Sequence, residues 1–241
     1  MKQFLILGGE SRLARCFTSL YLNECITFNK TECNITNQSL LDRIIKQTPC
    51  RYILNCAAVT DIEVCERNPK LCFSVNAIAV YSLHKICLKY RKKLIQISSN
   101  AAVIPFNIYG WSKFLSEKMI KPQALIVRTD FYDRNTYIVK NLMRQNPINA
   151  YTNVYFNPVS VNRLAYQIYT NKDRSGTINI FTTEKITYYK FAQEFCDVFA
   201  LNKTRLVKGT RVKPLNLFVK SSINRNINQD LIDFKHYITQ K

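Results

Sequence analysis

The chain has 241 residues, 47% of them hydrophobic, which is enough for one large domain or for a nucleotide-binding core with a small appended lobe. No apolar run comes near the 18 residues of a membrane span, and the apolar start Phe4–Leu7 is too short for a signal peptide, so no membrane partner is expected. The net charge of +19 favours acidic partners, but its lysines and arginines are spread along the chain, so nucleic acid is not expected as the main partner.

The cysteines number nine and form no CxxC pair, and several fall within runs that predict strands or helices. We therefore expect reduced, mostly buried thiols and a cytoplasmic location. A metal site is not expected, because the two histidines, His84 and His236, have no ligand-like partner at short spacing.

The N-terminal residues predict a strand, a tight turn and a helix. The apolar run Gln3–Leu7 ends at Gly8 and Gly9, and apolar residues then recur at helical spacing. Such a turn directs backbone N–H groups and a helix N-terminus at a ligand above the strand ends, which suits a pyrophosphate. Two glycine positions of a GxxGxxG loop are Ser11 and Ala14 here, and Ser11 adds a side chain where the backbone should approach the ligand.

A second predicted strand, Cys25–Phe28, is followed by Asn29 and Lys30. Sites that prefer NAD usually have an acidic residue here to hold the ribose 2′-hydroxyl, and none is present. Lys30, together with Arg12, would suit a 2′-phosphate, so we expect NADP(H), with NAD(H) as the alternative. A solvated loop lysine is the other interpretation of Lys30.

Strands and helices continue to alternate up to Arg128. The predicted elements are a helix around Leu40–Ile45, a strand Tyr52–Ala58, a polar loop with Asp61, Glu63 and Glu66, a long helix from Pro69 to Ile86, a strand Lys93–Ser99, and a strand Ala124–Arg128. Ala57 and Ala58 are small enough for a ligand to lie against the backbone, and Ser98 and Ser99 bring two hydroxyls to a strand end. This alternation predicts an α/β fold with a doubly wound parallel sheet.

The segment Tyr109–Lys113 places a phenol and an ammonium four residues apart in a run that predicts a helix, so both groups share a face. A nearby ammonium favours the phenolate and lowers the pKa of a tyrosine, which is otherwise near 10. This spacing is common, and an amphipathic helix is the simpler interpretation. The glycine turn, the Asn55–Ala58 turn and the Ser98–Ser99 pair favour a catalytic role.

Beyond Thr129 the pattern changes. We predict helices at Tyr137–Met143, Val161–Tyr169 and Tyr188–Phe199 and a strand at Thr177–Phe181, whereas Lys208–Arg225 is basic and is either a phosphate-facing loop or a solvated surface. The expected division is a nucleotide-binding core over residues 1–128, completed by 158–181, and a substrate-binding lobe over 129–157 and 182–241.

Taken in order, these motifs resemble those of the dTDP-4-dehydrorhamnose reductase family, which are extended short-chain dehydrogenases/reductases that reduce sugar nucleotides. The resemblance covers nearly the whole chain. The matching segments are Leu7–Ala14, Asn34–Thr36, Asn55–Thr60, Glu63, Cys65–Glu66, Asn76–Ala77, Ser98–Ser99, Asn107–Lys113, Leu125–Thr129, Asn157–Val159 and Lys213–Asn216.

The resemblance implies a Rossmann-like fold with a small C-terminal substrate-binding lobe. It implies NADPH-dependent reduction of the 4-keto group of a nucleotide-linked 4-keto-6-deoxy sugar, such as dTDP- or UDP-4-dehydrorhamnose, in deoxysugar biosynthesis. By this similarity Tyr109 donates the proton, Lys113 binds the nicotinamide ribose and lowers the Tyr109 pKa, and Ser99 hydrogen-bonds the same carbonyl oxygen.

Further site residues follow from the resemblance and the turns. The cofactor-binding candidates are Gly8, Gly9, Ser11, Arg12, Leu13, Lys30, Cys56, Ala57, Ala58, Tyr109 and Lys113. The substrate-binding candidates are Thr60, Glu63, Ser99, Asn100, Phe131 and Lys213. The expected partner is a nucleotide sugar, and the sequence leaves a homo-oligomer open.

Three departures from the family pattern favour an alternative. The glycine loop is altered, the segment between Ser99 and Tyr109 is reduced to Asn100–Ile108, and Phe131 stands where a tryptophan is usual. The alternative is a catalytically inactive member that serves as an NADP-binding regulatory subunit, similar to the β subunit of methionine adenosyltransferase.

Overall fold

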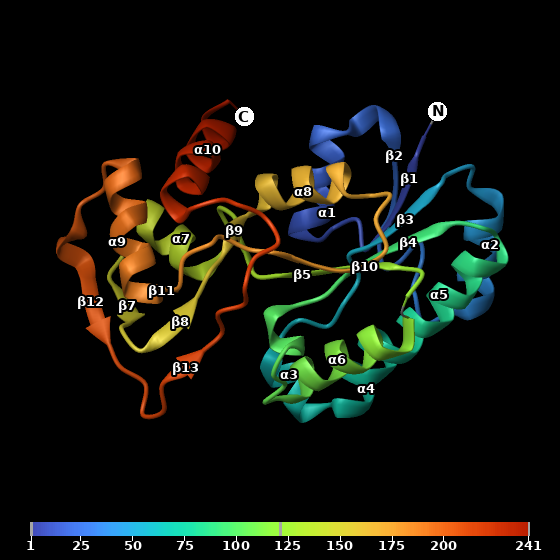
Figure 1. Cartoon of the computed structure of the whole chain (residues 1–241), viewed down its shortest axis with the longest axis horizontal. Helices are drawn as coiled ribbons and strands as arrows, with labels where there is room; N and C mark the ends of the chain where they lie inside the picture. The colour runs from blue at the N-terminus through green and yellow to red at the C-terminus, as the bar shows by residue number, and fades with distance from the viewer. Residues whose placement is uncertain (1, 121, 241) are drawn as a thin grey trace. The chain divides into compact units, whose positions relative to one another are not determined.

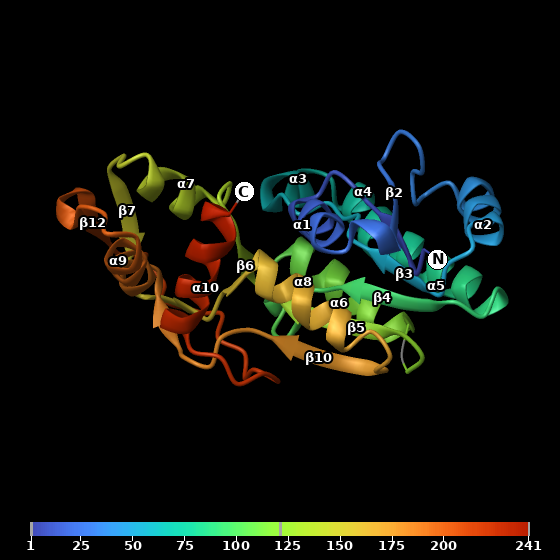
Figure 2. The ribbon, with the colours of Figure 1, turned by 90° about the horizontal axis from the view of Figure 1, so that it is seen from above.

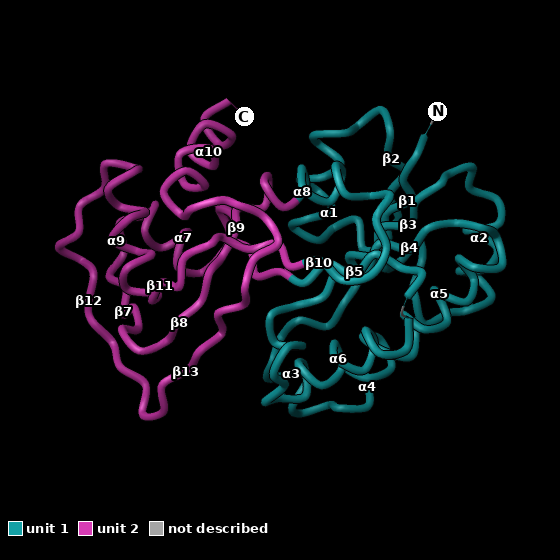
Figure 3. Tube along the Cα trace, viewed as in Figure 1, with its two compact units in different colours: residues 1–128, 165–178 teal, residues 129–164, 179–241 magenta. Residues whose placement is uncertain are grey.

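The computed structural model describes residues 2–120 and 122–240 and divides into two compact units (Figure 3). Unit 1 comprises residues 1–128 and 165–178, and unit 2 comprises residues 129–164 and 179–241. The segment 158–181, which the sequence assigned to the core, is therefore divided between the two units. One reason is that the short strand at its start pairs with a strand of unit 2.

Unit 1 is built on a six-stranded sheet with the strand order β10-β5-β4-β3-β1-β2 (Figure 1). The strands are β1 (Phe4–Leu7), β2 (Cys25–Phe28), β3 (Tyr52–Asn55), β4 (Lys93–Ile97), β5 (Leu125–Thr129) and β10 (Gly176–Ile180). The first five pair in parallel, and Leu7 lies between Phe28 and Asn55. The expected doubly wound parallel sheet is confirmed, and its order reverses between β1 and β3, where open α/β sheets bind ligands.

Helices cover both faces of this sheet (Figures 1 and 2). The helices are α2 (Gln38–Gln47), α5 (Ala79–Lys89) and α6 (Ile108–Ile120) on one face, and α1 (Arg12–Leu20) and α8 (Val161–Thr170) on the other. On the first face, Leu41, Leu83 and Ile120 join the strands in one apolar core. On the second, the ring of Phe4 packs on Phe17 and Tyr169, with centroids 4.9 and 5.9 Å apart.

The predicted polar loop after β3 is a helix, α3 (Ile62–Arg67), so this prediction is wrong. Asp61 caps its N-terminus by accepting from the Val64 N–H at 3.0 Å, and Glu63 pairs with Arg67 one turn later. Polar composition alone indicated a loop, but local capping and an i,i+4 ion pair stabilise a helix.

The long helix predicted from Pro69 is present in three parts: α4 (Pro69–Phe73), a π-helical turn (Ser74–Ile78) and α5. The stretch Pro69–Lys89 contains an 18-residue window with a mean hydropathy of 1.5, so by length and composition it could cross a membrane, although no membrane span was expected. Half of that window is buried in the fold, and Val80, Leu83 and Cys87 lie in the sheet core. Packing against the sheet therefore accounts for the apolar residues of the buried half of the window.

Unit 2 contains short strands and helices of its own. They are β6 (Phe131–Tyr132), α7 (Tyr137–Met143), β7 (Ile148–Tyr151), β8 (Val154–Phe156), β9 (Val159–Ser160), β11 (Ile186–Thr187), α9 (Tyr188–Phe199), β12 (Leu206–Gly209), β13 (Leu215–Asn216) and α10 (Ile227–Thr239). The strands pair as β6 with β9, β7 with β12, and β8 with both β11 and β13. The helices predicted at Tyr137–Met143 and Tyr188–Phe199 are confirmed, whereas α10 is absent from the predicted elements and the basic segment Lys208–Arg225 contains β13.

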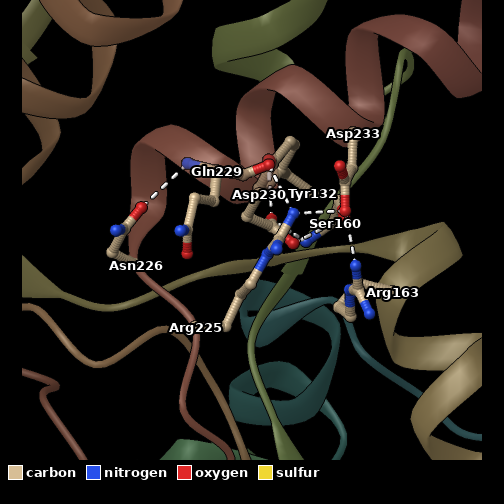
Figure 4. Close-up of polar contacts among 8 residues, drawn as sticks. All are labelled: Tyr132, Ser160, Arg163, Arg225, Asn226, Gln229, Asp230 and Asp233. Atoms are coloured by element: carbon tan, nitrogen blue, oxygen red, sulfur yellow. Dashed lines mark hydrogen bonds and ion pairs between the residues drawn. The ribbon is translucent and has the colours of Figure 1, made fainter.

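A buried carboxylate fixes α10 to β6 and β9 (Figure 4). Asp230 accepts hydrogen bonds from the Tyr132 hydroxyl at 2.8 Å and from the Ser160 N–H and hydroxyl at 2.7 and 3.0 Å. Burial raises the pKa of Asp230 to about 6. On the same helix, Asp233 forms an ion pair with Arg225. Together with the packing of Phe234 on the Tyr132 ring, at a centroid distance of 5.0 Å, these polar contacts hold α10 against the strands of unit 2.

Candidate cofactor-binding and catalytic site

The site begins at the turn after β1, which lies against the chain that leaves β3. Gly8 has a φ of +76°, and a Cβ there would lie 2.7 Å from the Ala57 backbone nitrogen. Only glycine permits this conformation and this contact. The Gly9 N–H donates to the carbonyl of Phe28 at 2.9 Å. Segments that follow β1, β2 and β3 are thus brought together at the point where the strand order reverses.

Ser11 caps the helix that follows this turn. Its hydroxyl accepts from the Ala14 N–H at 3.2 Å, and its own N–H donates to the carbonyl of Gly8 at 2.9 Å. The side chain that replaces a glycine is therefore folded back onto α1. The first turn of α1, which contains Arg12 and Leu13, carries no acidic residue, so the positive end of the helix dipole is not offset by a carboxylate of that turn. This helix terminus can stabilise an anion.

A cavity of about 300 Å³ lies in unit 1 beside these turns. Its lining comes from the segments after β1, β2 and β3 and from α4 and the π-helical turn: Gly8, Glu10, Ser11, Lys30, Cys33, Asn34, Ile35, Thr36, Cys56, Ala57, Ala58, Val59, Leu71 and Val75. Six of the expected cofactor-binding residues line it. Burial raises the pKa of Cys56 to about 12, so its thiol stays protonated at neutral pH.

The loop after β2 leaves Lys30 at the cavity and turns its first acidic residue away. Glu32 accepts from the Asn29 N–H at 2.8 Å, while the Asn29 side chain accepts from the N–H groups of Thr31 and Glu32 at 2.9 and 3.0 Å. Lys30 is exposed and lines the cavity, whereas Glu32 does not line it. The charge beside the cavity at this loop is therefore positive.

Tyr109 and Lys113 share a face of α6, as their spacing predicts. The Lys113 Nζ lies 6.0 Å from the centroid of the Tyr109 ring and donates to the carbonyl of Ile97 at 3.0 Å. Lys113 is only 4% exposed, and its burial lowers its pKa to about 8. The lysine is thus held between the end of β4 and the tyrosine, and at neutral pH most of it carries a charge.

The Ser99 hydroxyl is hydrogen-bonded to the two residues that follow it in the chain. Its hydroxyl donates to Asn100 Oδ1 at 3.0 Å and accepts from the Ala101 N–H at 3.2 Å, so it caps the short 3₁₀ turn Asn100–Ala102. A hydroxyl that serves a carbonyl substrate would have to turn away from Asn100.

The remaining substrate-binding candidates lie in different places. Thr60 is exposed just before α3, and Glu63 is exposed on α3 in its ion pair with Arg67. Phe131 lies on β6 and Lys213 is an exposed residue before β13, both in unit 2.

Asn76 is a site residue whose contacts the sequence did not indicate. It is fully buried in the π-helical turn, and its amide exchanges two hydrogen bonds of 2.8 Å with the backbone N–H and carbonyl of Val59. It also donates to the Ser112 hydroxyl on α6 at 3.0 Å. Asn76 therefore joins the loop after β3 to the helix of Tyr109, and a π-helical turn is often found at such functional positions. The residues next to Asn76 in the sequence do not indicate that it contacts Val59 and Ser112.

A buried ion pair between Glu117 and Arg128 connects α6 to the sheet one turn after Lys113. Arg128 donates to both carboxylate oxygens of Glu117 at 2.6 to 3.1 Å, and the Ser98 hydroxyl donates to Glu117 at 2.6 Å. Glu117 is 1% exposed and lies one turn after Lys113. Ser98 and Arg128 come from the ends of β4 and β5, so this pair fixes α6 to the sheet.

All nine cysteines are free thiols and seven are buried, which confirms the expectation that most of the thiols are buried. Within residues 2–120 and 122–240, no three side chains of His, Cys, Asp or Glu lie together in a group that could hold a metal ion.

The doubly wound sheet, the glycine turn at the strand reversal and the Tyr109–Lys113 face of α6 define an extended short-chain dehydrogenase/reductase fold. The sequence model of the family described as the RmlD substrate binding domain matches residues 1–220. The chain belongs to this family.

Two curated relatives are dTDP-4-dehydrorhamnose reductases. The one from Aggregatibacter actinomycetemcomitans is 24% identical over 167 residues, which cover 60% of this chain and 57% of the relative. The one from Mycolicibacterium smegmatis is 30% identical over 122 residues, which cover 43% of this chain and 37% of the relative. The matched part is thus about half the length of these relatives or less.

Solved structures with the same fold align over nearly the whole chain. The dTDP-4-dehydrorhamnose reductase of Bacillus anthracis in complex with NADP has a TM-score of 0.90 at 20% identity and covers 100% of both chains. The structure of a dTDP-4-dehydrorhamnose reductase from Clostridium acetobutylicum has a TM-score of 0.88 at 21% identity and covers 98% of this chain and 99% of that one. At this identity the likeness establishes the fold.

Proposed function

We propose that the protein is an NADPH-dependent oxidoreductase that reduces the 4-keto group of a nucleotide-linked 4-keto-6-deoxy sugar, such as dTDP- or UDP-4-dehydrorhamnose, in deoxysugar biosynthesis. The observation that carries this proposal is the buried, still cationic Lys113 held beside Tyr109 on α6. Asn76 hydrogen-bonds both to Val59, which lines the cavity, and to Ser112, which precedes Lys113, so the cofactor region and the Tyr–Lys pair adjoin. The family relatives named as dTDP-4-dehydrorhamnose reductases support this substrate class.

The residues present fit a dinucleotide. The close approach of Gly8 to Ala57 and the N-terminus of α1 form an anion site, to which Gly9, Ser11, Arg12 and Leu13 contribute backbone. The adjoining cavity, with Cys56, Ala57 and Ala58, suits the adenosine part, and Lys30 suits a 2′-phosphate. When bound, NADPH supplies the hydride. The structurally similar dTDP-4-dehydrorhamnose reductase of Bacillus anthracis was solved in complex with NADP. A structurally similar dTDP-glucose 4,6-dehydratase was solved in complex with NAD, so NAD(H) is the alternative cofactor.

Side chains of the protein donate the proton and stabilise the charge that develops during reduction. Tyr109 donates its phenolic proton to the carbonyl oxygen of the sugar, and the Lys113 ammonium stabilises the phenolate that is left. The same lysine can bind the ribose of the nicotinamide. Ser99 hydrogen-bonds the carbonyl oxygen after its hydroxyl turns from Asn100. Thr60, Glu63, Asn100, Phe131 and Lys213 remain candidates for binding the sugar and its diphosphate.

The second candidate function is a non-catalytic NADP-binding regulatory subunit. The observation that favours it is the Ser99 hydroxyl, which caps the Asn100–Ala102 turn instead of being free for a substrate. The shortened segment before Tyr109 holds this turn close to α6. For either function, the free thiols fit a reducing compartment, and we propose a cytoplasmic location.

The cofactor proposal is tested by titrating NADPH and NADH into the wild type, Lys30→Ala and the control Lys85→Ala. Lys85 is exposed on α5, on the helix layer that packs on the sheet. We expect the Kd for NADPH to rise about tenfold in Lys30→Ala, the loss of roughly one charge-assisted hydrogen bond, with little change for NADH. Equal affinities of Lys30→Ala and Lys85→Ala for NADPH would contradict the role of Lys30.

The two candidate functions are separated by turnover. The proposed reductase oxidises NADPH when a dTDP- or UDP-linked 4-keto-6-deoxyhexose is added. Tight NADPH binding without oxidation of the cofactor by any of these sugars would support the regulatory subunit instead.

A further inference from the structure

The first turn of α6, which carries Tyr109, is held by a carboxylate from another helix. The Ile108 N–H donates to Glu66 Oε1 at 2.8 Å, and Glu66 lies near the end of α3. The Gly110 N–H donates to Asn107 Oδ1 at 2.7 Å. Tyr109 thus lies between two residues whose N–H groups are capped by side chains. Of these two caps, the one from Glu66 carries a negative charge.

A close backbone contact fixes the same turn on its other side. A Cβ at Gly110 would lie 2.7 Å from the carbonyl oxygen of Ala101 and 3.3 Å from Pro105 Cα. The first turn of α6 is therefore packed directly on the segment that Ser99 caps. Glu66 reaches this turn from α3, which directly follows the loop of Cys56 to Thr60. A shift of α3 or α6 would break the contact of Glu66 with Ile108.

We propose that Glu66 is a positioning residue for Tyr109: its carboxylate fixes the first turn of α6 and sets a negative charge beside the tyrosine that opposes the charge of Lys113. This inference rests on the proposed reduction, in which Tyr109 must hold a proton in order to donate it. Lys113 alone favours the phenolate. An anion at the N-terminus of α6 also offsets the positive end of the helix dipole, so it favours the neutral phenol.

Other charged and titratable groups lie on the elements packed around Tyr109. They include Lys113, Glu117 and Lys118 on α6, Asp61 and the Glu63–Arg67 ion pair at α3, Lys70 on α4, the buried thiols of Cys65 and Cys72, and Arg128, which is bound to Glu117. The segment from Ser99 to Asn107 contains no acidic or basic residue. Substitution of Glu66 by glutamine leaves all these groups in place and changes one charge.

The test compares Glu66→Gln, Glu66→Ala and Asp42→Asn in the 241-residue chain. Asp42 lies on α2, where Lys89 and Tyr90 bind its carboxylate, so Asp42→Asn controls for the loss of an acidic group. The pKa of Tyr109 is measured by fluorine NMR of 3-fluorotyrosine incorporated at position 109, which needs no turnover. We expect it to fall by about half a unit in both Glu66 variants and to stay unchanged in Asp42→Asn.

Turnover distinguishes the hydrogen bond from the charge. The amide oxygen of glutamine can still accept from the Ile108 N–H, so Glu66→Gln should keep most of the wild-type kcat, with its pH profile shifted to lower pH. Glu66→Ala should lose roughly five- to tenfold in kcat, since its helix cap is gone. An unchanged Tyr109 pKa in Glu66→Gln, or a wild-type kcat in Glu66→Ala, would overturn the proposal. If the wild type reduces no keto sugar, the proposed function fails, and the NMR titration still decides the role of Glu66.

Discussion

Replacing Lys113 with methionine should stabilise the protein at neutral pH. Burial lowers the pKa of Lys113 from its ordinary value of 10.5 to about 8, which corresponds to about 3 kcal/mol of destabilisation at pH 7. Methionine fills a similar volume without a charge, but it loses the hydrogen bond to the carbonyl of Ile97, which contributes about 1 kcal/mol. The free energy of unfolding should therefore rise by about 2 kcal/mol in Lys113→Met, while reduction of the sugar is lost.

The pH dependence of this difference gives the sharper test. Between about pH 8 and 10.5 the unfolded chain binds more protons at Lys113 than the folded chain, so the wild type gains stability with rising pH through this lysine. The advantage of Lys113→Met should therefore shrink from pH 7 to pH 9.5 in urea-unfolding measurements. The control is Lys118→Met, because Lys118 is exposed on the same helix. A Lys113→Met variant that is less stable than the wild type by the same amount at both pH values would refute this reasoning.

Three further outcomes are expected. Burial raises the pKa of Asp230 from 3.8 to about 6, so the folded chain binds more protons than the unfolded chain between these pH values. The free energy of unfolding of the wild type, measured in urea, should therefore rise by about 2 kcal/mol relative to that of Asp230→Asn as the pH falls from 7 to 4.5. Glu117→Ala leaves Arg128 without its buried partner and should cost about 3–5 kcal/mol by the same assay, with part of the loss recovered in a double variant with Arg128→Met. Gly110→Ala should cost about 1–3 kcal/mol, because its Cβ would meet the carbonyl of Ala101, and a wild-type melting temperature would contradict this contact.

The sheet of unit 1 could be predicted because buried parallel strands are short apolar runs, and each is ended by a turn residue with a local role. Gly8 ends β1 with a positive φ, and Asn55 ends β3 with a side chain that accepts from the Ala57 N–H at 3.1 Å. That hydrogen bond also explains why the predicted strand Tyr52–Ala58 stops at Asn55. Apolar periodicity likewise located α7 and α9.

The missed elements depend on contacts that a pattern does not contain. In α10, Ile227, Leu231 and Phe234 recur at helical spacing, but Asp230 between them is buried by Tyr132 and Ser160, which lie about 70 to 98 residues earlier in the chain. A buried acidic residue at such a position cannot be distinguished from a surface residue by sequence alone.

The candidate site also combines local features, which the sequence predicts, with long-range contacts, which it does not. The spacing of Tyr109 and Lys113 and the turn at Gly8 were sufficient to indicate a Tyr–Lys pair and a dinucleotide site, because both are local features. The contacts of Asn76 with Val59 and of Glu66 with Ile108 join segments 17 and 42 residues apart, so they become visible only in the folded chain. The catalytic roles of Ser99, Tyr109 and Lys113 stay predictions.

The most direct test of the proposed reductase is NADPH oxidation at 340 nm with dTDP- and UDP-linked 4-keto-6-deoxyhexoses, for the wild type, Tyr109→Phe and the control Tyr81→Phe. Tyr81 is partly exposed on α5 and carries no role in the site. We predict turnover by the wild type and by Tyr81→Phe and a loss of at least about a hundredfold in Tyr109→Phe. Turnover that survives in Tyr109→Phe, or a wild type that binds NADPH and oxidises it with none of these sugars, would contradict the account.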